Sequence, residues 1–333
     1  MDTFLNNILH FPEQLGRGGL SLLRLSLLRG ATPDGIVVVG MGGSGLAGEI
    51  LTAVRHEIGL RLPLYIWKDY GLPQHPFARP LMVFLSFSGD TEETLSGFRE
   101  LTRKSDHRTY LAAVGGGGTL LRLAEKRNIP SVAFAAGDLT PRQAVGRMFY
   151  SLKEILLALR LRVKIPDYTH LSSRRFALQG KTMARKLRRR LIHIYTSEPH
   201  RHIGYLWKVS LNETAKVPAF ANSLPEMNHN ELAEFDAPKK GFAIPSAALF
   251  FTDARFTPRL KKRFRVTETL LTHHHVATSH IPLTGNALLE QTWNAAVLAQ
   301  WTSYFLAKEN YVPLRELALP SPKIVRDLKR RMK

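Results

Sequence analysis

The sequence predicts an α/β protein of two domains, each with a mainly parallel sheet flanked by helices in a doubly wound arrangement. Three observations favour this fold. The chain has 333 residues, about the length of two domains. Short runs of valine, isoleucine and leucine alternate with helical patterns in both halves, which is typical of parallel sheets. Two of these runs end in turns rich in glycine and serine, at the strand ends where open α/β sheets bind ligands.

In the first half we expect five strands, at residues 36–39, 64–67, 82–87, 109–114 and 131–134. Helices are expected at residues 47–56, 92–104 and 119–126. A further helix opens at Pro141 and runs to about residue 160, because proline is favoured in a first helical turn. The four glycines at 115–118 predict a flexible strand-to-helix connection rather than a ligand site.

In the second half we expect strands at residues 191–195, 247–251 and 274–280. Helices are expected at residues 205–214, 258–263 and 285–308. We place the domain boundary within the long connecting helix, which gives an N-terminal domain of residues 1–155 and a C-terminal domain of residues 156–333.

The composition is that of an ordinary globular protein, with 44% hydrophobic and 22% charged residues. The chain has no cysteine, which excludes disulfides, cysteine-ligated zinc and thiol catalysis. The first residues lack the basic region of a secretory signal, and the apolar run at 20–28 contains Arg24 and is too short to span a bilayer. We therefore expect a cytoplasmic protein.

The net charge is +20, and much of it lies at residues 174–190 and 323–333. A positive field attracts anionic substrates. We expect these charges to form solvated helix faces. Contact with nucleic acid or membrane is the less favoured alternative, because no recognition motif or interleaved aromatic residue accompanies the charge.

Two short turns carry the chemistry of the first domain. They are Gly42-Gly43-Ser44-Gly45 and Ser86-Phe87-Ser88-Gly89-Asp90-Thr91. Each joins a predicted strand to a predicted helix, so hydroxyl groups and unpaired backbone N–H groups meet at one edge of the sheet. This combination suits the three oxygens of a phosphate monoester, and the sequence predicts a small phosphorylated ligand here.

A dinucleotide site competes with this interpretation. Residues 40–45 fit the G-x-G-x-x-G pattern, and Asp69 follows the next strand where a ribose-binding acid would lie. However, that pattern requires neither Ser44 nor the second hydroxyl cluster. An NAD-binding oxidoreductase is therefore the weaker alternative.

The second domain offers two polar runs. Glu213 ends a predicted helix, and residues 224–231 include His229, so a carboxylate base and a titratable imidazole are available. His273, His274 and His275 suggest a metal, but adjacent residues of a strand point to opposite faces. We predict no metal site.

The chain resembles the bifunctional phosphoglucose/phosphomannose isomerases, which have two sugar isomerase (SIS) domains of flavodoxin-like fold. The runs that carry the resemblance are Phe11-Pro12-Glu13-Gln14-Leu15, Gly40-Met41-Gly42-Gly43-Ser44-Gly45, Ser86-Phe87-Ser88-Gly89-Asp90-Thr91-Glu92-Glu93-Thr94, Pro141-Arg142, Asn212-Glu213 with Lys216-Val217-Pro218, Leu224-Pro225-Glu226 with His229-Asn230-Glu231, and Trp301-Thr302-Ser303-Tyr304-Phe305-Leu306-Ala307. The phosphate turn is common to SIS proteins, whereas the Asn-Glu and His-Asn-Glu runs are far more specific.

The resemblance implies a role for each matching residue. Residues holding the 6-phosphate of a sugar would be Gly43, Ser44, Ser86, Ser88 and Thr91. Arg142 would stabilise the enediolate, and Glu213 would move the proton between C1 and C2. His229 would open the sugar ring from the second subunit of a homodimer, and Lys308 is the candidate for a further site lysine. No cofactor is implied.

Two departures from the family concern the last long helix. The family usually ends it with Gly-Val-Asp-Pro, but here the run is Asn310-Tyr311-Val312-Pro313. Gln300 lies about where glucose-specific isomerases resemble one another in having Gln, and Thr302 is close by. Enzymes that act on both sugars have been associated with Thr at this place. We therefore expect mannose 6-phosphate to be the poorer substrate.

The leading hypothesis is thus an aldose–ketose isomerase that interconverts glucose 6-phosphate with fructose 6-phosphate through a cis-enediol, with mannose 6-phosphate as a poorer second substrate. The main alternative is a non-catalytic SIS protein that senses a sugar phosphate. Such a sensor would keep the serine turns but would not need Glu213, His229 or Arg142.

Overall fold

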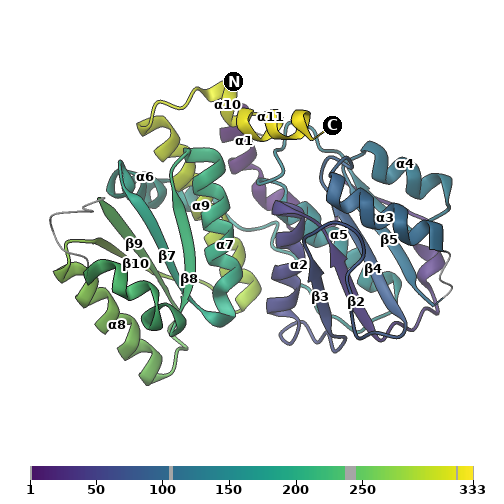
Figure 1. Ribbon diagram of the computed structural model, residues 1–333, viewed down its shortest axis with the longest axis horizontal. Coiled ribbons are helices and arrows are strands. Elements are labelled where there is room, and N and C mark those ends of the chain that lie inside the picture. Colours follow the sequence, from purple (N-terminus) through teal and green to yellow (C-terminus); the bar gives the residue numbers. More distant parts are fainter. Residues whose placement is uncertain (1, 105–107, 237–244, 320–321, 333) are drawn as a thin grey trace. The chain divides into compact units, whose positions relative to one another are not determined.

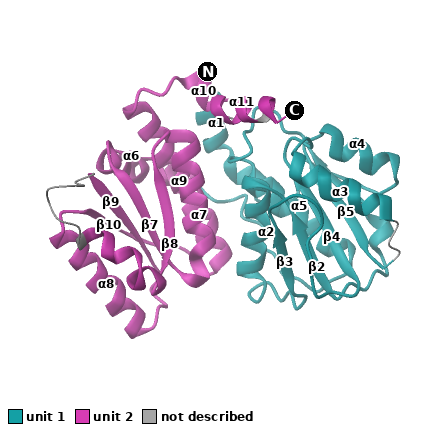
Figure 2. Cartoon of the chain, in the orientation of Figure 1, with its two compact units in different colours: residues 1–172 teal, residues 173–333 magenta. Residues whose placement is uncertain are grey.

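A computed structural model describes residues 2–104, 108–236, 245–319 and 322–332. The chain forms two compact units, residues 1–172 and 173–333 (Figure 2). The expected boundary after residue 155 falls inside helix α5 (Val145–Ala158). The residues after α5 stay with the first unit because their backbone bonds to it: the Lys164 N–H donates to the Ile58 carbonyl at 2.9 Å, and the Tyr168 N–H to the Leu15 carbonyl at 3.0 Å.

The sheet of the first unit has the strand order β1-β6-β5-β4-β2-β3 (Figure 1). The five expected strands are present and parallel: β2 (Gly35–Val39), β3 (Leu64–Trp67), β4 (Pro80–Ser86), β5 (Tyr110–Gly115) and β6 (Ser131–Phe134). The edge strand β1 (Leu20–Leu23) was not predicted and pairs antiparallel to β6. None of its four residues is fully buried, and Ser21 interrupts the leucines, so it lacks the apolar run that marks the other strands.

Helices cover both faces of this sheet. They are α1 (Thr3–Leu9), α2 (Gly42–Val54), α3 (Glu92–Lys104), α4 (Gly118–Lys126) and α5, with 3-10 turns η1 (Phe11–Gln14) and η2 (Leu25–Leu28). The buried faces of α3 and α4 pack on β2, β4 and β5. In this core the rings of Phe84 and Phe98 meet edge to face, with their centres 5.3 Å apart. Helix α2 begins five residues earlier than expected, because its glycines and serine are themselves the first helical turn.

The sheet of the second unit is parallel, with the order β10-β9-β7-β8. Its strands are β7 (Leu191–Ser197), β8 (Ala219–Leu224), β9 (Ser246–Thr252) and β10 (Ala277–Pro282). Strand β8 was not predicted, because four of its six residues are polar or not fully buried. The strand expected at 274–280 begins at Ala277 instead, since helix α8 (Pro258–His273) extends ten residues beyond its expected end.

The helices of this unit are α6 (Ala177–Leu187), α7 (Arg201–Ser210), α8, α9 (Leu288–Glu309), α10 (Leu314–Leu317) and α11 (Lys323–Arg331). Short turns are η3 (Ser173–Phe176), η4 (Glu198–His200), the π-helix η5 (Leu211–Ala215), η6 (Glu226–His229) and η7 (Glu231–Asp236). Helix α9 is buried along most of its length. It approaches α6 so closely that a Cβ on Gly180 would lie 2.6 Å from the Trp301 Cβ.

The surplus positive charge lies largely on exposed helix faces. In α6, Lys181, Arg185 and Lys186 are exposed while Met183 and Leu187 are buried. Helix α11 combines exposed basic side chains with exposed Ile324 and Leu328. Over the described part of the chain, no helix is both long and apolar enough to cross a bilayer.

Two histidines lie buried between α7 and α9. His202 contacts the Thr292 hydroxyl through Nε2 at 2.8 Å, and His200 contacts the Gln291 side chain at 3.2 Å. Burial lowers the pKa of His202 to about 3, with a smaller effect of the neighbouring His200. Burial also lowers the pKa of His200, so both rings are held neutral in the folded chain.

We therefore expect the free energy of unfolding to fall as the pH drops from about 6.5 toward about 3. In this window the unfolded chain protonates these histidines and the folded chain keeps His202 neutral; each such histidine contributes a slope of about 1.4 kcal/mol per pH unit. The variant His202→Gln should lose that share of the slope in denaturant unfolding at several pH values. His275→Gln, at an exposed position, is the control. An unchanged slope in His202→Gln would contradict a neutral buried ring.

Candidate active site

The two serine turns lie together at the point where the first sheet reverses its strand order. Strand β2 has β3 on one side and β4 on the other. The connection after β2 leads to β3, and the connection after β4 leads to β5 on the opposite side, so the two leave in opposite directions. Such a switch point leaves a crevice at the carboxyl ends of the strands. The turn after β2 begins α2, and the turn after β4 leads into α3.

The first turn presents backbone donors. Gly42 has a positive φ of 51° and starts α2. Met41, which precedes it, makes no side-chain hydrogen bond to the first turn. The N–H groups at the start of a helix point along its axis and attract anions. The Ser44 hydroxyl accepts a hydrogen bond from the Phe87 N–H at 3.2 Å and thereby joins the two turns.

The second turn is organised around Ser86. Its hydroxyl accepts hydrogen bonds from the N–H groups of Gly89 at 3.0 Å and Thr91 at 3.4 Å, and it lies 2.8 Å from the Thr91 hydroxyl. Ser86 is fully buried, whereas Ser88 is exposed and accepts a hydrogen bond from the Asp90 N–H at 3.2 Å. Ser86 therefore shapes the turn, and Ser88 and Thr91 carry the more accessible hydroxyls.

The four-glycine turn supports the second serine turn. A Cβ on Gly89 would lie 1.9 Å from the Gly117 carbonyl oxygen, and one on Gly118 would lie 2.2 Å from the Ser88 carbonyl oxygen. The Asp90 carboxylate accepts a hydrogen bond from the Thr119 N–H at 3.0 Å. Residues 115–118 are thus a strand-to-helix connection, as expected, but they are packed against the candidate site because only glycine permits so close an approach.

Arg142 lies beside the first turn. A Cβ on Gly43 would lie 2.7 Å from the Pro141 carbonyl oxygen, so glycine allows α2 to touch the Pro141-Arg142 backbone. Arg142 is buried and its guanidinium lies 5.5 Å above the ring of Phe4. The first unit therefore brings together the two serine turns and the backbone of a buried arginine.

Glu213 lies in the π-helix that follows α7. Helices of this type are rare and occur often at functional sites. The turn ends at Lys216, which has a left-handed backbone. The Asn310 side chain donates to the Ala215 carbonyl at 3.1 Å, so the end of α9 is tied to the Glu213 turn. Asn310 opens the run that differs from the Gly-Val-Asp-Pro pattern, and its contact with the Glu213 turn was not predicted from the sequence.

The remaining candidates of α9 differ in exposure. Lys308 is exposed near the end of the helix, with its ammonium group 5.4 Å from the Tyr304 ring centre. Gln300 and Thr302 are buried. Within the described residues, the Gln300 Oε1 and Thr302 Oγ1 atoms have no hydrogen-bond partner.

Glu213 and His229 lie at opposite ends of the strands of the second sheet, one before β8 and the other after it. Helix α7 starts at the carboxyl end of β7. It runs back to the amino end of the parallel strand β8, which Glu213 precedes. His229 follows the carboxyl end of the same strand. The six residues of β8 span about 17 Å at ~3.3 Å per residue. The structure therefore separates these two residues within one chain.

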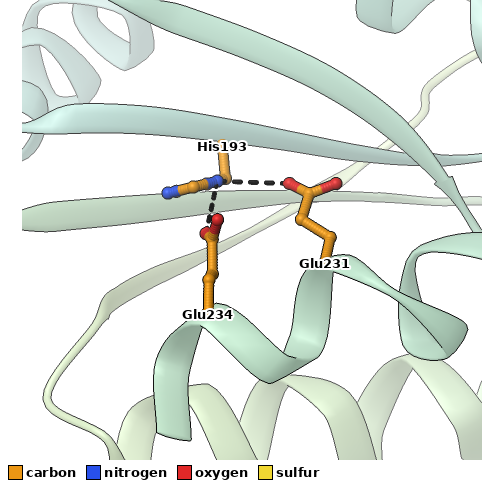
Figure 3. Close-up of side chains that lie close together, drawn as sticks. All are labelled: His193, Glu231 and Glu234. Carbon is orange, nitrogen blue, oxygen red and sulfur yellow. Dashed lines mark hydrogen bonds and ion pairs between the residues drawn. The ribbon is translucent and has the colours of Figure 1, made fainter. Parts of the chain in front are cut away.

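Glu231, the last residue of the His-Asn-Glu run, forms with its partners a partly buried polar cluster that was not predicted from the sequence (Figure 3). His193 of β7 is buried, and its Nδ1 lies 3.3 Å from a Glu231 carboxylate oxygen and 3.4 Å from a Glu234 oxygen. Glu231 also accepts hydrogen bonds from the Tyr195 hydroxyl at 3.1 Å and from the Asn222 amide at 2.7 Å.

These contacts set the ionisation of the cluster. Burial tends to raise the pKa of Glu231, but the hydrogen bonds from His193, Asn222 and Tyr195 prevail and lower it. Burial, reinforced by the Glu231 charge, raises the pKa of Glu234 and also that of Tyr195. One imidazole and two carboxylates are a donor set for divalent metal. However, protein donors already occupy both Glu231 oxygens, so hydrogen bonding explains the cluster.

The three consecutive histidines do not lie on a strand, which corrects the reason given for excluding a metal there. His273 ends α8, and His274 and His275 form the following turn, where His275 has a positive φ of 62°. All three are exposed. Asp69, the candidate ribose ligand, accepts a hydrogen bond from the Tyr70 N–H at 2.7 Å.

Comparisons with known proteins agree with this architecture. Residues 176–316 match the model of the bacterial phospho-glucose isomerase C-terminal SIS domain. A bifunctional phosphoglucose/phosphomannose isomerase of Aquifex aeolicus is 29% identical over 277 residues, covering 82% of this chain and 84% of the relative. One of Thermoplasma acidophilum is 27% identical over 312 residues, covering 91% of each chain. The solved tagatose-6-phosphate ketose/aldose isomerase of Escherichia coli, 15% identical, superposes with a TM-score of 0.65 over 96% of both chains and shows the shared fold.

Proposed function

Because the chain belongs to the family of bifunctional phosphoglucose/phosphomannose isomerases, we propose that it interconverts glucose 6-phosphate and fructose 6-phosphate through a cis-enediol. The observation that carries the proposal is the pair of serine turns at the switch point of the first sheet, with Arg142 adjoining them. A sensor or an NAD-binding protein would use one part of this arrangement and leave the rest without a role.

The first unit binds the phosphate in this proposal. The N–H groups at the start of α2 and the hydroxyls of Ser44, Ser88 and Thr91 donate to phosphate oxygens, and Ser86 keeps the second turn in shape. Phosphate held at C6 supplies binding energy that positions the reacting carbons at the other end of the sugar. Arg142 stays charged at any working pH and stabilises the oxyanion of the enediolate.

Glu213 carries out the proton transfer in this proposal. One carboxylate takes the proton from C2 and returns it to C1, which is sufficient for an aldose–ketose isomerisation. We therefore propose that neither metal nor cofactor takes part, with Lys308 as a further cation near the end of α9. Because a charged sugar phosphate does not cross a bilayer unaided, we also propose a cytoplasmic location.

The base assignment predicts a large loss of turnover in Glu213→Gln, which keeps the shape of the side chain and removes the base. We expect kcat to fall by at least ~100-fold in a coupled assay of fructose 6-phosphate formation. Glu309→Gln is a control, because that carboxylate forms a long contact of 3.9 Å with Arg188. Near-normal turnover in Glu213→Gln, or loss of wild-type activity in EDTA, would be incompatible with the mechanism.

The buried Gln300 predicts a preference between epimers. Its amide occupies space and hydrogen-bonding positions in α9 that a threonine would leave open. We expect a lower kcat/KM with mannose 6-phosphate than with glucose 6-phosphate, and a smaller difference in Gln300→Thr. Equal values for the two sugars in the wild-type protein would disprove this role.

We further propose a homodimer in which each active site receives His229 from the other subunit to open the sugar ring. The separation of Glu213 and His229 by the length of β8 supports this arrangement. A two-fold axis delivers the same segment to both sites.

The shared site predicts complementation between two inactive variants. Glu213→Gln and His229→Ala chains, mixed, dissociated and reassociated, should regain about a quarter of wild-type activity, because half of randomly paired dimers are mixed and each mixed dimer has one intact site. Sedimentation verifies the dimer. Confirmed mixed dimers that stay inactive would show that His229 does not act in the partner's site.

A further inference from the structure

Glu231 fastens the segment that carries His229 to the face of the second sheet. The carboxylate is met by side chains from two neighbouring strands, His193 and Tyr195 of β7 and Asn222 of β8. Figure 3 draws its contact with His193. Tyr195 and Asn222 are paired across the two strands, so Glu231 lies over their junction. A hydrogen bond to a charged group is stronger than a neutral one, so three such bonds hold the segment firmly at Glu231.

A second attachment lies on the other side of His229. The Asn228 amide donates to the Thr267 hydroxyl of α8 at 2.9 Å, and Arg263 of α8 donates to the Asn228 oxygen at 3.2 Å. The Asn230 side chain accepts a hydrogen bond from the Glu231 N–H at 2.6 Å and donates to Glu226 at 3.0 Å. The backbone on both sides of His229 is therefore fixed.

His229 itself takes no part in these attachments. Its side chain is exposed, and no described residue forms a hydrogen bond or ion pair with it. An exposed imidazole whose two flanks are fastened is suited to act on something outside its own unit. Fixing the flanks limits the orientations of the ring, and small misplacements of a catalytic group cost large factors in rate.

We propose that Glu231 is a positioning residue for His229, and that the hydrogen bonds of Glu231 to His193, Tyr195 and Asn222 set the orientation in which His229 reaches the sugar ring. This inference rests on the proposed isomerase function. Without the Glu231 carboxylate the segment samples further conformations, and activity falls by the fraction of chains that no longer present His229 correctly.

A double-mutant cycle tests the proposal. Glu231→Gln, which keeps the shape of the side chain, should lower kcat on glucose 6-phosphate by about 10- to 100-fold. His229→Ala should lower it at least as far. The double variant should be within about 2-fold of His229→Ala, because a residue that acts only through His229 has no effect once His229 is gone. Independent effects that multiply in the double variant would overturn the proposal.

Two further measurements separate positioning from a general structural role. Glucitol 6-phosphate, which has no ring to open, should bind Glu231→Gln with unchanged Kd. Glu234→Gln is the matched control: Glu234 also contacts His193 at 3.4 Å, but it is about half exposed, so the variant should keep near-normal kcat. A weaker Kd in Glu231→Gln, or an equal kcat loss in Glu234→Gln, would contradict the role assigned to Glu231.

If Glu231→Gln does not fold, as judged by its thermal melt, Tyr195→Phe removes one of the three hydrogen bonds and leaves the carboxylate in place. Its kcat loss should be smaller and should likewise vanish in the His229→Ala background. A wild-type protein with no isomerase activity would refute the proposed function itself. An active wild type with independent effects of Glu231 and His229 would refute only the present inference.

Discussion

Strands β2 to β6 of the first sheet are parallel to one another, and so are strands β7 to β10 of the second sheet. Each connection between them therefore has to return through a segment on one face of the sheet. This constraint decides where each candidate residue lies. The turns after β2 and β4 meet at one edge of the first sheet because those strands are parallel neighbours. Because β7 and β8 are also parallel, α7 runs back along the second sheet, and Glu213 lies at the end of the strands opposite to His229. The case for a shared active site follows from this topology.

Close backbone contacts then give the first unit its shape. Gly43 permits α2 to touch the backbone at Pro141, and Gly89 permits the second serine turn to touch the four-glycine turn. A side chain at either position would collide with a carbonyl oxygen of another loop, which cannot move as the end of a flexible side chain can. The proposed anion site is therefore built by mutual contact of three loops and the start of one helix, and its accessible hydroxyls belong to an otherwise buried framework.

The second unit relies on buried polar groups. Glu231 is bound by three side chains, while His200 and His202 are held between α7 and α9. Such groups contribute little when paired but leave a large penalty when a partner is removed. Polar networks of this kind therefore specify one arrangement of the segments that they join. In this protein the joined segments carry Glu213, His229 and the end of α9.

The sequence by itself determined the α/β class, five of the strands in the first sheet and the two serine turns, because these features depend on local patterns of apolar residues, glycine and hydroxyl groups. Short runs that resemble a known family also made Glu213, His229 and Arg142 candidate site residues. It missed β1 and β8, whose residues are half-buried or polar and become strands only by pairing with β6 and β7. The tertiary structure alone decided that Ser86 is buried, that Asn310 holds the Glu213 turn and that Glu231 bridges two strands. Each of these depends on contacts between residues distant in sequence or on burial, which no local pattern records.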